Sequence, residues 1–107
     1  MNETTDVLLV ITNAPDRATA EAIAQRLVES RAAACVNILA SCRSVYRWQG
    51  AVETADEVPV LIKTTAAAYP RVETLIRDAH PYELPEIIAV PVGRGLPAYL
   101  DWVRAAT

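Results

Sequence analysis

The sequence of 107 residues predicts an α+β domain in which a β-α-β-β-α-β order is followed by a C-terminal helix. Short runs of β-branched and aliphatic residues alternate with segments whose apolar residues repeat at helical spacing. Proline, glycine and aspartate separate these segments, and no internal repeat, linker or low-complexity stretch interrupts them. The length suits one hydrophobic core, so we expect residues 1–107 to form a single domain.

The first two predicted elements are a strand and a helix. Residues 7–11 form a continuous β-branched and aliphatic run, which is typical of a buried strand. Asp16 follows a turn and is placed to cap a helix. The next apolar residues fall at i, i+3, i+4, i+7 and i+8, namely Ala20, Ile23, Ala24, Leu27 and Val28. This spacing predicts an amphipathic helix that ends near residue 30 or 31.

A long β-hairpin is predicted next. Residues 34–48 have strand character that is weakest at 40–43, and Gly50 supplies the turn into the second arm. One face of the second arm is apolar and carries Val58, Val60 and Ile62. Pro59 lies on the other face and cannot donate a ladder hydrogen bond, so it belongs at a sheet edge or a bulge.

The far end of this hairpin is expected to project beyond the domain. It carries Tyr46 and Trp48 on one face, and a two-stranded ribbon is marginally stable alone in water. Packing the two aromatic rings on a neighbouring chain would stabilise the ribbon. The sequence therefore predicts an oligomer.

The last three elements are a helix, a strand and a helix. Helical spacing predicts a helix over about 67–79, with Pro70 in its first turn. Residues 87–92 are apolar throughout, which predicts a strand buried on both faces. Pro97 starts a short terminal helix with an apolar side formed by Tyr99, Leu100, Trp102 and Val103. The complete order is the ferredoxin-like arrangement, a βαββαβ sandwich of an antiparallel sheet with helices on one face.

Charge and cysteine usage restrict the class of partner and compartment. The formal net charge is −3 and the Lys and Arg residues are scattered, which argues against nucleic acid as a partner. The N-terminus has no basic region and no apolar run is long enough to cross a membrane, so we expect a cytoplasmic protein that does not bind membranes. Cys35 and Cys42 are too far apart on one strand for a disulfide, and both are expected to be reduced and packed.

The segment 80–86 is the strongest candidate for a site, because it contains the chain's only histidine, two prolines and two glutamates. Proline directs the residue before it toward extended backbone, so His80 should end a helix and the segment should be stiff. One interpretation is a rigid connector with His80 as a helix C-terminal cap. The other is a binding site, and the sequence leaves both open.

Other candidate chemistry is sparse. Neither cysteine has a local signature of a catalytic nucleophile and there is no glycine-rich phosphate loop, so we expect no enzymatic activity. Lys63 and Glu86 both end apolar strands and either form an ion pair or are two exposed charges. A single chain lacks a recognisable set of metal ligands, although His80 could bind a metal together with a carboxylate.

Several segments in this order resemble the CutA divalent-cation-tolerance family: residues 12–16 (TNAPD), 33–37 (AACVN), 46–50 (YRWQG), 63–65 (KTT) and 80–86 (HPYELPE). The resemblance extends from about Val7 to Val103. It implies a ferredoxin-like fold assembled into a homotrimer similar to the PII signalling proteins, and a role in tolerance of copper and other divalent metals. The implied trimer agrees with the projecting hairpin.

The resemblance also implies where metal would bind. Some members have a copper-binding cysteine at the position of Thr12. They also have a His-His pair before Pro-Tyr, where this chain has Ala79 followed by His80. What remains is weak binding of Cu²⁺ or another divalent metal by His80 with Glu86. The alternative is a PII-like signalling trimer that binds a small anionic metabolite in clefts between subunits. The residues expected in such a cleft are Asn37, Tyr46, Trp48, Lys63, Tyr82 and Glu86.

Overall fold

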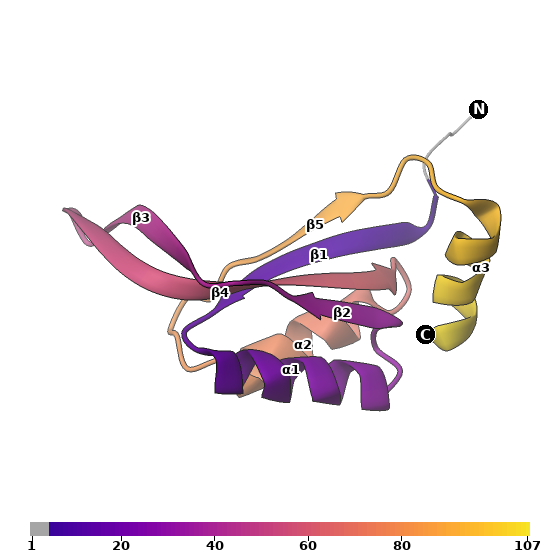
Figure 1. Ribbon diagram of the computed structural model, residues 1–107, viewed down its shortest axis with the longest axis horizontal. Helices are drawn as coiled ribbons and strands as arrows, with labels where there is room; N and C mark the ends of the chain where they lie inside the picture. Colours follow the sequence, from indigo (N-terminus) through magenta and orange to yellow (C-terminus); the bar gives the residue numbers. More distant parts are fainter. Residues whose placement is uncertain (1–4) are drawn as a thin grey trace.

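A computed structural model describes residues 5–107 as an antiparallel sheet with helices α1 and α2 on one face and α3 at one end (Figure 1). The elements in chain order are β1 (Val7–Ala14), α1 (Arg17–Glu29), β2 (Cys35–Ile38), β3 (Cys42–Trp48), β4 (Ala51–Thr65), α2 (Tyr69–Ala79), β5 (Ile87–Pro91) and α3 (Pro97–Ala106). The predicted order is confirmed, with the first arm of the hairpin divided into β2 and β3. β1 extends three residues beyond the predicted 7–11, and α2 starts two residues after the predicted position 67.

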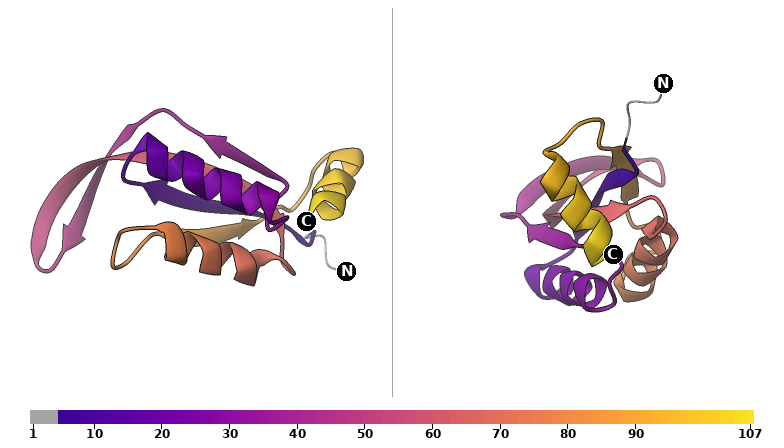
Figure 2. Two further views of the ribbon diagram at one scale, coloured as in Figure 1. Left: turned by 90° about the horizontal axis from the view of Figure 1, so that it is seen from below. Right: turned by 90° about the vertical axis from the view of Figure 1, so that its right-hand side faces the viewer.

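The sheet has the strand order β2-β4-β1-β5, and β3 extends the pairing along the far part of β4. All of these strand pairs are antiparallel. α1 and α2 pack side by side beneath the sheet, as the two views of Figure 2 and the contacts between the helices show. This is the predicted ferredoxin-like sandwich, and the β3–β4 hairpin extends from one end of it (Figure 1).

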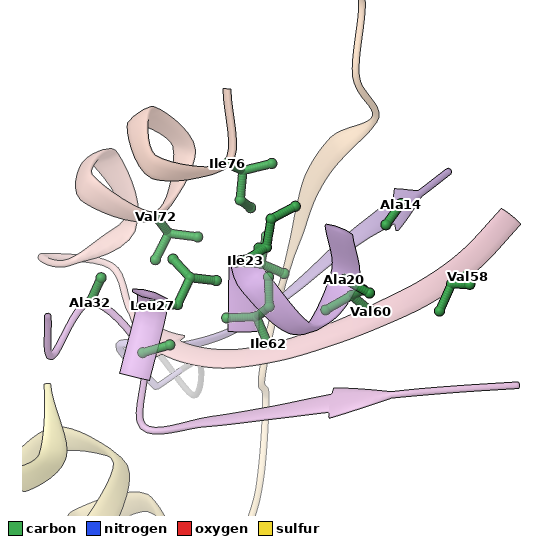
Figure 3. Close-up of a cluster of buried hydrophobic side chains, with 12 residues drawn as sticks. Ala14, Ala20, Ile23, Leu27, Ala32, Val58, Val60, Ile62, Val72 and Ile76 are labelled. Atoms are coloured by element: carbon green, nitrogen blue, oxygen red, sulfur yellow. The ribbon is translucent and has the colours of Figure 1, made fainter. Parts of the chain in front are cut away.

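The core lies between the helices and the sheet. It contains Ile23 and Leu27 of α1, Val72 and Ile76 of α2, and the predicted apolar face of β4, Val58, Val60 and Ile62 (Figure 3). Asp16 caps α1 as predicted, because its carboxylate accepts a hydrogen bond of 2.7 Å from the Thr19 backbone N–H. Val28, which the spacing also assigned to the apolar face, is 45% exposed.

A bulge interrupts the hairpin at the point where its sequence is weakest. Ile38 pairs with Val60 and Cys42 pairs with Glu57, so the three residues 39–41 lie opposite the two residues 58–59. The Leu39 backbone N–H donates to the Pro59 carbonyl, so this backbone edge of Pro59 faces the irregular stretch 39–41. The N–H that proline lacks would point to the same edge, where the ladder is already interrupted. The sequence predicted that Pro59 lies at an edge or a bulge, and the structure places it at a bulge.

Besides Val28, three predictions of burial are wrong for the single chain. β5 pairs only with β1 among the described strands and is an edge strand, with Ile88 50% and Val90 47% exposed. On α3, Leu100 and Val103 are buried, but Tyr99 and Trp102 lie at the surface, where their rings pack at a tilt with centroids 5.6 Å apart. Both cysteines are free as predicted, yet Cys42 is exposed rather than packed. A sequence pattern identifies which residues are apolar, but it does not predict whether they pack within the chain or against another chain.

Candidate functional site

His80 joins the end of α2 to β1. Its side chain is only 7% exposed, and its Nε2 lies 2.6 Å from the carbonyl oxygen of Asn13. Nδ1 accepts a hydrogen bond of 3.2 Å from the Tyr82 backbone N–H, so Nε2 carries the proton and donates to Asn13. The His80 and Tyr82 rings also pack with centroids 4.6 Å apart. These contacts match the rigid-connector interpretation of residues 80–86.

Of the two alternatives for Lys63 and Glu86, the ion pair does not form. Lys63 Nζ donates to the Asn37 side-chain oxygen and lies 4.0 Å from the Cys35 sulfur. Glu86 accepts a hydrogen bond of 3.1 Å from the Asn13 side-chain amide. In the ladder Lys63 pairs with Leu9 of β1, whereas Glu86 binds Asn13, four residues further along that strand. The two charges therefore lie at different positions along the strands.

A hollow of about 840 Å³ lies between the projecting hairpin and the segment 81–86. Most of the hairpin residues that line it share one face of β3 and β4, because alternate side chains of a strand point to the same face, and Val45 lines it as well. Tyr46 pairs directly with Glu53 in the ladder, and Trp48 and Glu57 extend the same face in both directions. Tyr82 and Glu86 line the hollow from the connector.

The hollow is acidic and aromatic. Its described lining includes four glutamates, Glu53, Glu57, Glu83 and Glu86, and no lysine or arginine. Glu57 is only 9% exposed. Burial raises the pKa of the Tyr82 hydroxyl above its usual value, and the neighbouring Glu57 carboxylate raises that pKa further. The site therefore offers negative charge and π faces, which favour a cation over an anion.

The structure brings together only part of the predicted ligand cleft. Tyr46, Trp48, Tyr82 and Glu86 surround one hollow, whereas Asn37 and Lys63 bind each other on the β2 side of β4. The sequence interpretation missed Glu53 and Glu57. A two-residue turn at 49–50 fixes the register that places both glutamates on the Tyr46 face, so hairpin periodicity was the available signal.

The predicted metal ligands do not form a complete metal centre within one chain. Residues 5–107 contain no group of three or more His, Cys, Asp or Glu side chains placed to hold a metal ion. Both ring nitrogens of His80 are already hydrogen-bonded, and Glu86 is bonded to Asn13. Coordination by His80 would have to replace one of these bonds. Metal binding by His80 and Glu86 stays a prediction.

Together, the ferredoxin-like sheet, the extended hairpin and the HPYELPE connector define a small α+β protein with the architecture that the family resemblance implies. The family model described as "CutA1 divalent ion tolerance protein" matches residues 8–106. The chain belongs to this family.

Curated relatives agree with the family model. The divalent-cation tolerance protein CutA of Thermus thermophilus is 44% identical over 99 residues, which are 92% of this chain and 96% of that protein. The mouse protein CutA is 43% identical over 93 residues, and the match covers 87% of this chain but only 52% of that longer protein.

Solved structures have the same fold. A CutA crystal structure from Xylella fastidiosa matches with a TM-score of 0.93 and 46% identity, covering 95% of this chain and 98% of that one. A CutA from Archaeoglobus fulgidus, described as a periplasmic divalent cation tolerance protein, matches with a TM-score of 0.90 and 36% identity, covering 94% and 97% of the two chains.

The described helices and the relatives' descriptions concern cellular compartment and activity. Within residues 5–107 no helix is long and apolar enough to cross a membrane. One relative is described as periplasmic, so a cytoplasmic location stays a prediction. The family is named for ion tolerance and not for a reaction.

Proposed function

We propose that this chain acts in tolerance of divalent cations, copper among them, as a homotrimer. Membership of the divalent ion tolerance family supports the role. The number of copies is what the family resemblance implies, a homotrimer similar to the PII proteins. The observation that supports assembly most directly is the apolar surface that a single chain leaves uncovered.

That surface lies on the sheet edge and the hairpin. Ile88 and Val90 of β5 are about half exposed, and Val45 and Val52 near the hairpin end are 67% and 66% exposed. β5 also has a side that pairs with no described strand, and an open strand edge is a template for pairing with another chain. Exposed apolar side chains beside an open edge are typical of a surface that a second copy covers.

The assembly is tested by the mass of the purified protein in solution. Light scattering after size exclusion should give three times the chain mass of 11.6 kDa. Ile88→Lys places a charge on the β5 edge and should reduce the mass, whereas Ala22→Lys on the exposed side of α1 should not. A monomeric wild-type protein at micromolar concentration would overturn the proposal.

The metal part of the proposal is weak coordination of Cu²⁺ by His80 with Glu86. It is weak because the metal must replace the hydrogen bond from the Tyr82 N–H or the one to the Asn13 carbonyl. Calorimetry with Cu(II) should give a small saturable heat that is lost in His80→Ala and reduced in Glu86→Gln. Copper heat that survives in His80→Ala would reject this ligand assignment without affecting the tolerance role.

The role itself is tested in the source organism. Deleting the gene should reduce growth in raised Cu(II) or Zn(II) while leaving growth in ordinary medium unchanged. Restoring the wild-type gene should restore tolerance, and the Ile88→Lys variant should restore it less well than Ala22→Lys. Equal growth of the deletion and parent strains in every metal would overturn the role. The anionic-metabolite alternative has no support in the hollow, whose described lining is acidic.

A further inference from the structure

Cys35 and Lys63 form a thiol–amine pair on adjacent strands. They are direct partners in the β2–β4 ladder, so their side chains share one face of the sheet. Because Ile62 faces the helices, Lys63 and Cys35 lie on the opposite face. The Lys63 Nζ lies 4.0 Å from the Cys35 Sγ and donates to the Asn37 side-chain oxygen. Asn37 thus holds the amine beside the sulfur.

The amine of this pair has no second copy elsewhere in the sequence. Lys63 is the only lysine of the chain, and the other nine of its ten basic side chains are arginines. Lysine carries a primary amine that can act as a nucleophile once it has lost its proton, whereas the arginine guanidinium stays protonated. The chain therefore places its single nucleophilic side-chain amine directly opposite a cysteine.

The second cysteine has different surroundings and provides an internal comparison. Cys42 is exposed, its sulfur lies 3.9 Å from the Ser44 hydroxyl, and its ladder partner is Glu57. Cys35 is half-buried, and Tyr99 of α3 lies beside it. Burial raises the pKa of the Tyr99 hydroxyl above its usual value, and the neighbouring Cys35 sulfur raises that pKa further. An oxidised sulfur would meet an amine at Cys35 and a hydroxyl group at Cys42.

The chemistry of such a pair is balanced by one oxidant. Hydrogen peroxide oxidises a thiol to a sulfenic acid and is itself reduced to water. A nearby nitrogen can then attack the sulfur, which forms an S–N bond and releases the hydroxyl group as a second molecule of water. A lysine side chain starts as an ammonium group, so one proton also passes to the solvent. The product is a sulfenamide.

We propose that Cys35 and Lys63 form a reversible sulfenamide bond in the presence of hydrogen peroxide. The bond joins β2 to β4 and removes the positive charge of Lys63. Thiol reductants reverse it, because one thiol attacks the sulfur, a second completes a disulfide of the reductant, and both side chains are restored. This redox switch uses neither the acidic hollow nor the proposed ligands His80 and Glu86, so it and the tolerance role can fail separately.

The experiment treats the assembled protein with hydrogen peroxide and then measures the intact mass of the denatured chain. Cys42→Ser leaves Cys35 as the only thiol, so an intrachain disulfide is impossible. The treated Cys42→Ser protein should lose the mass of two hydrogen atoms and regain it with a thiol reductant. Proteolysis should yield linked peptides that contain residues 35 and 63. Cys35→Ser should gain oxygen at Cys42 instead.

Lys63→Arg in the Cys42→Ser background is the matched variant, because it keeps the positive charge and removes the primary amine. Its oxidation should stop at the sulfenic acid, which dimedone captures as a stable adduct. The same dimedone treatment should give much less adduct when Lys63 is present, since the amine reaches the sulfur first. Circular dichroism melting shows whether the variant folds, and the linked peptides decide the question if it does not.

Three results would overturn the proposal. If the loss of two hydrogen atoms persists in Lys63→Arg, the bond involves another nitrogen, such as a backbone amide. If Cys42→Ser only gains oxygen and gives as much dimedone adduct as Lys63→Arg, the amine does not reach the sulfur. If Cys35 does not react while Cys42 does, the pair is structural.

Discussion

Thr12 and Thr64 form a natural comparison at the scale of single residues. Both side chains are fully buried. The Thr64 hydroxyl donates a hydrogen bond of 2.6 Å to the Ala32 carbonyl, whereas the Thr12 hydroxyl has no partner within residues 5–107. Valine has almost the same shape as threonine, so replacing each residue by valine isolates the contribution of its hydroxyl.

We expect the two substitutions to have opposite effects on stability. Thr64→Val removes a buried hydrogen bond and leaves the Ala32 carbonyl without it, so unfolding free energy should fall by about 1–3 kcal/mol. Thr12→Val removes an unpaired buried hydroxyl, so unfolding free energy should stay the same or rise by up to about 2 kcal/mol. Urea unfolding at one fixed protein concentration measures both. A loss of stability in Thr12→Val comparable to that in Thr64→Val would contradict the expectation.

Asp16 links helix capping to pH. The backbone N–H of Thr19 donates to its carboxylate, and this hydrogen bond lowers the pKa of Asp16 below its ordinary 3.8. Because the folded-state pKa is the lower one, the charged cap stabilises the fold above pH 3.8, and this stabilisation is lost as pH falls through the folded-state pKa. Stability from this residue is thus greatest near neutral pH.

The expected result is a pH-dependent effect of Asp16→Ala. At neutral pH the variant should have a thermal midpoint lower by on the order of a few °C. The difference from wild type should shrink below about pH 3.8. Asp16→Asn keeps a capping oxygen and should stay close to wild type at neutral pH. Circular dichroism melting curves across this range provide the measurement, and a constant difference at every pH would exclude a charged cap.

At the scale of elements, the hairpin turn determines how the acidic and aromatic residues meet. Gln49 has a φ of +49° and Gly50 a φ of +83°, which is the left-handed geometry of a two-residue turn between paired strands. Space around Gly50 is open, since a Cβ added there would meet no atom within 4 Å. Any cost of a side chain at Gly50 is therefore a cost of backbone conformation.

This geometry predicts the effect of two substitutions in the turn. Gly50→Ala should lower the unfolding free energy by about 1 kcal/mol, because alanine is strained at positive φ. Gln49→Asn should raise it by up to about 0.5 kcal/mol, because asparagine adopts this conformation more readily. Urea midpoints for the two single variants test this. A Gly50→Ala variant as stable as wild type would show that the turn rearranges at little cost.

The hairpin also shows what sequence periodicity can and cannot predict. Alternation in β4 correctly assigned Val58, Val60 and Ile62 to the core, because their environment follows from local strand geometry. The bulge opposite Pro59 could be anticipated as well, since proline lacks the N–H that a regular ladder needs. The acidic hollow, in contrast, is lined by both the hairpin and the connector 81–86, which comes from a distant part of the chain, so hairpin periodicity alone could not predict it.

At the scale of the whole molecule, long-range contacts decide which candidate residues remain available. His80 was singled out by its neighbours in the sequence, but its hydrogen bond to Asn13 joins residues 67 apart in the chain. Lys63 and Glu86 each end an apolar run, yet their partners are Asn37 and Asn13 rather than each other. Sequence patterns place such residues on elements, whereas the sheet register determines their partners.

The uncovered apolar surface makes a prediction about how stability depends on concentration. If three copies must separate to unfold, dilution favours the unfolded chains. Each tenfold dilution should then lower the unfolding free energy by on the order of 1 kcal/mol per chain, and the thermal midpoint should fall with it. The Ala22→Lys variant should show the same dependence as wild type, because this residue lies on the exposed side of α1.

Ile88→Lys should separate assembly from folding. Its charge lies on the β5 edge, so we expect a lower thermal midpoint that no longer varies with concentration. The main core between α1, α2 and β4 is built from other residues, so the variant should still unfold cooperatively. Melting curves over a hundredfold range of concentration make the comparison. A wild-type midpoint that stays constant over that range would mean that the β5 edge is exposed in the native protein and that its apolar side chains serve another partner.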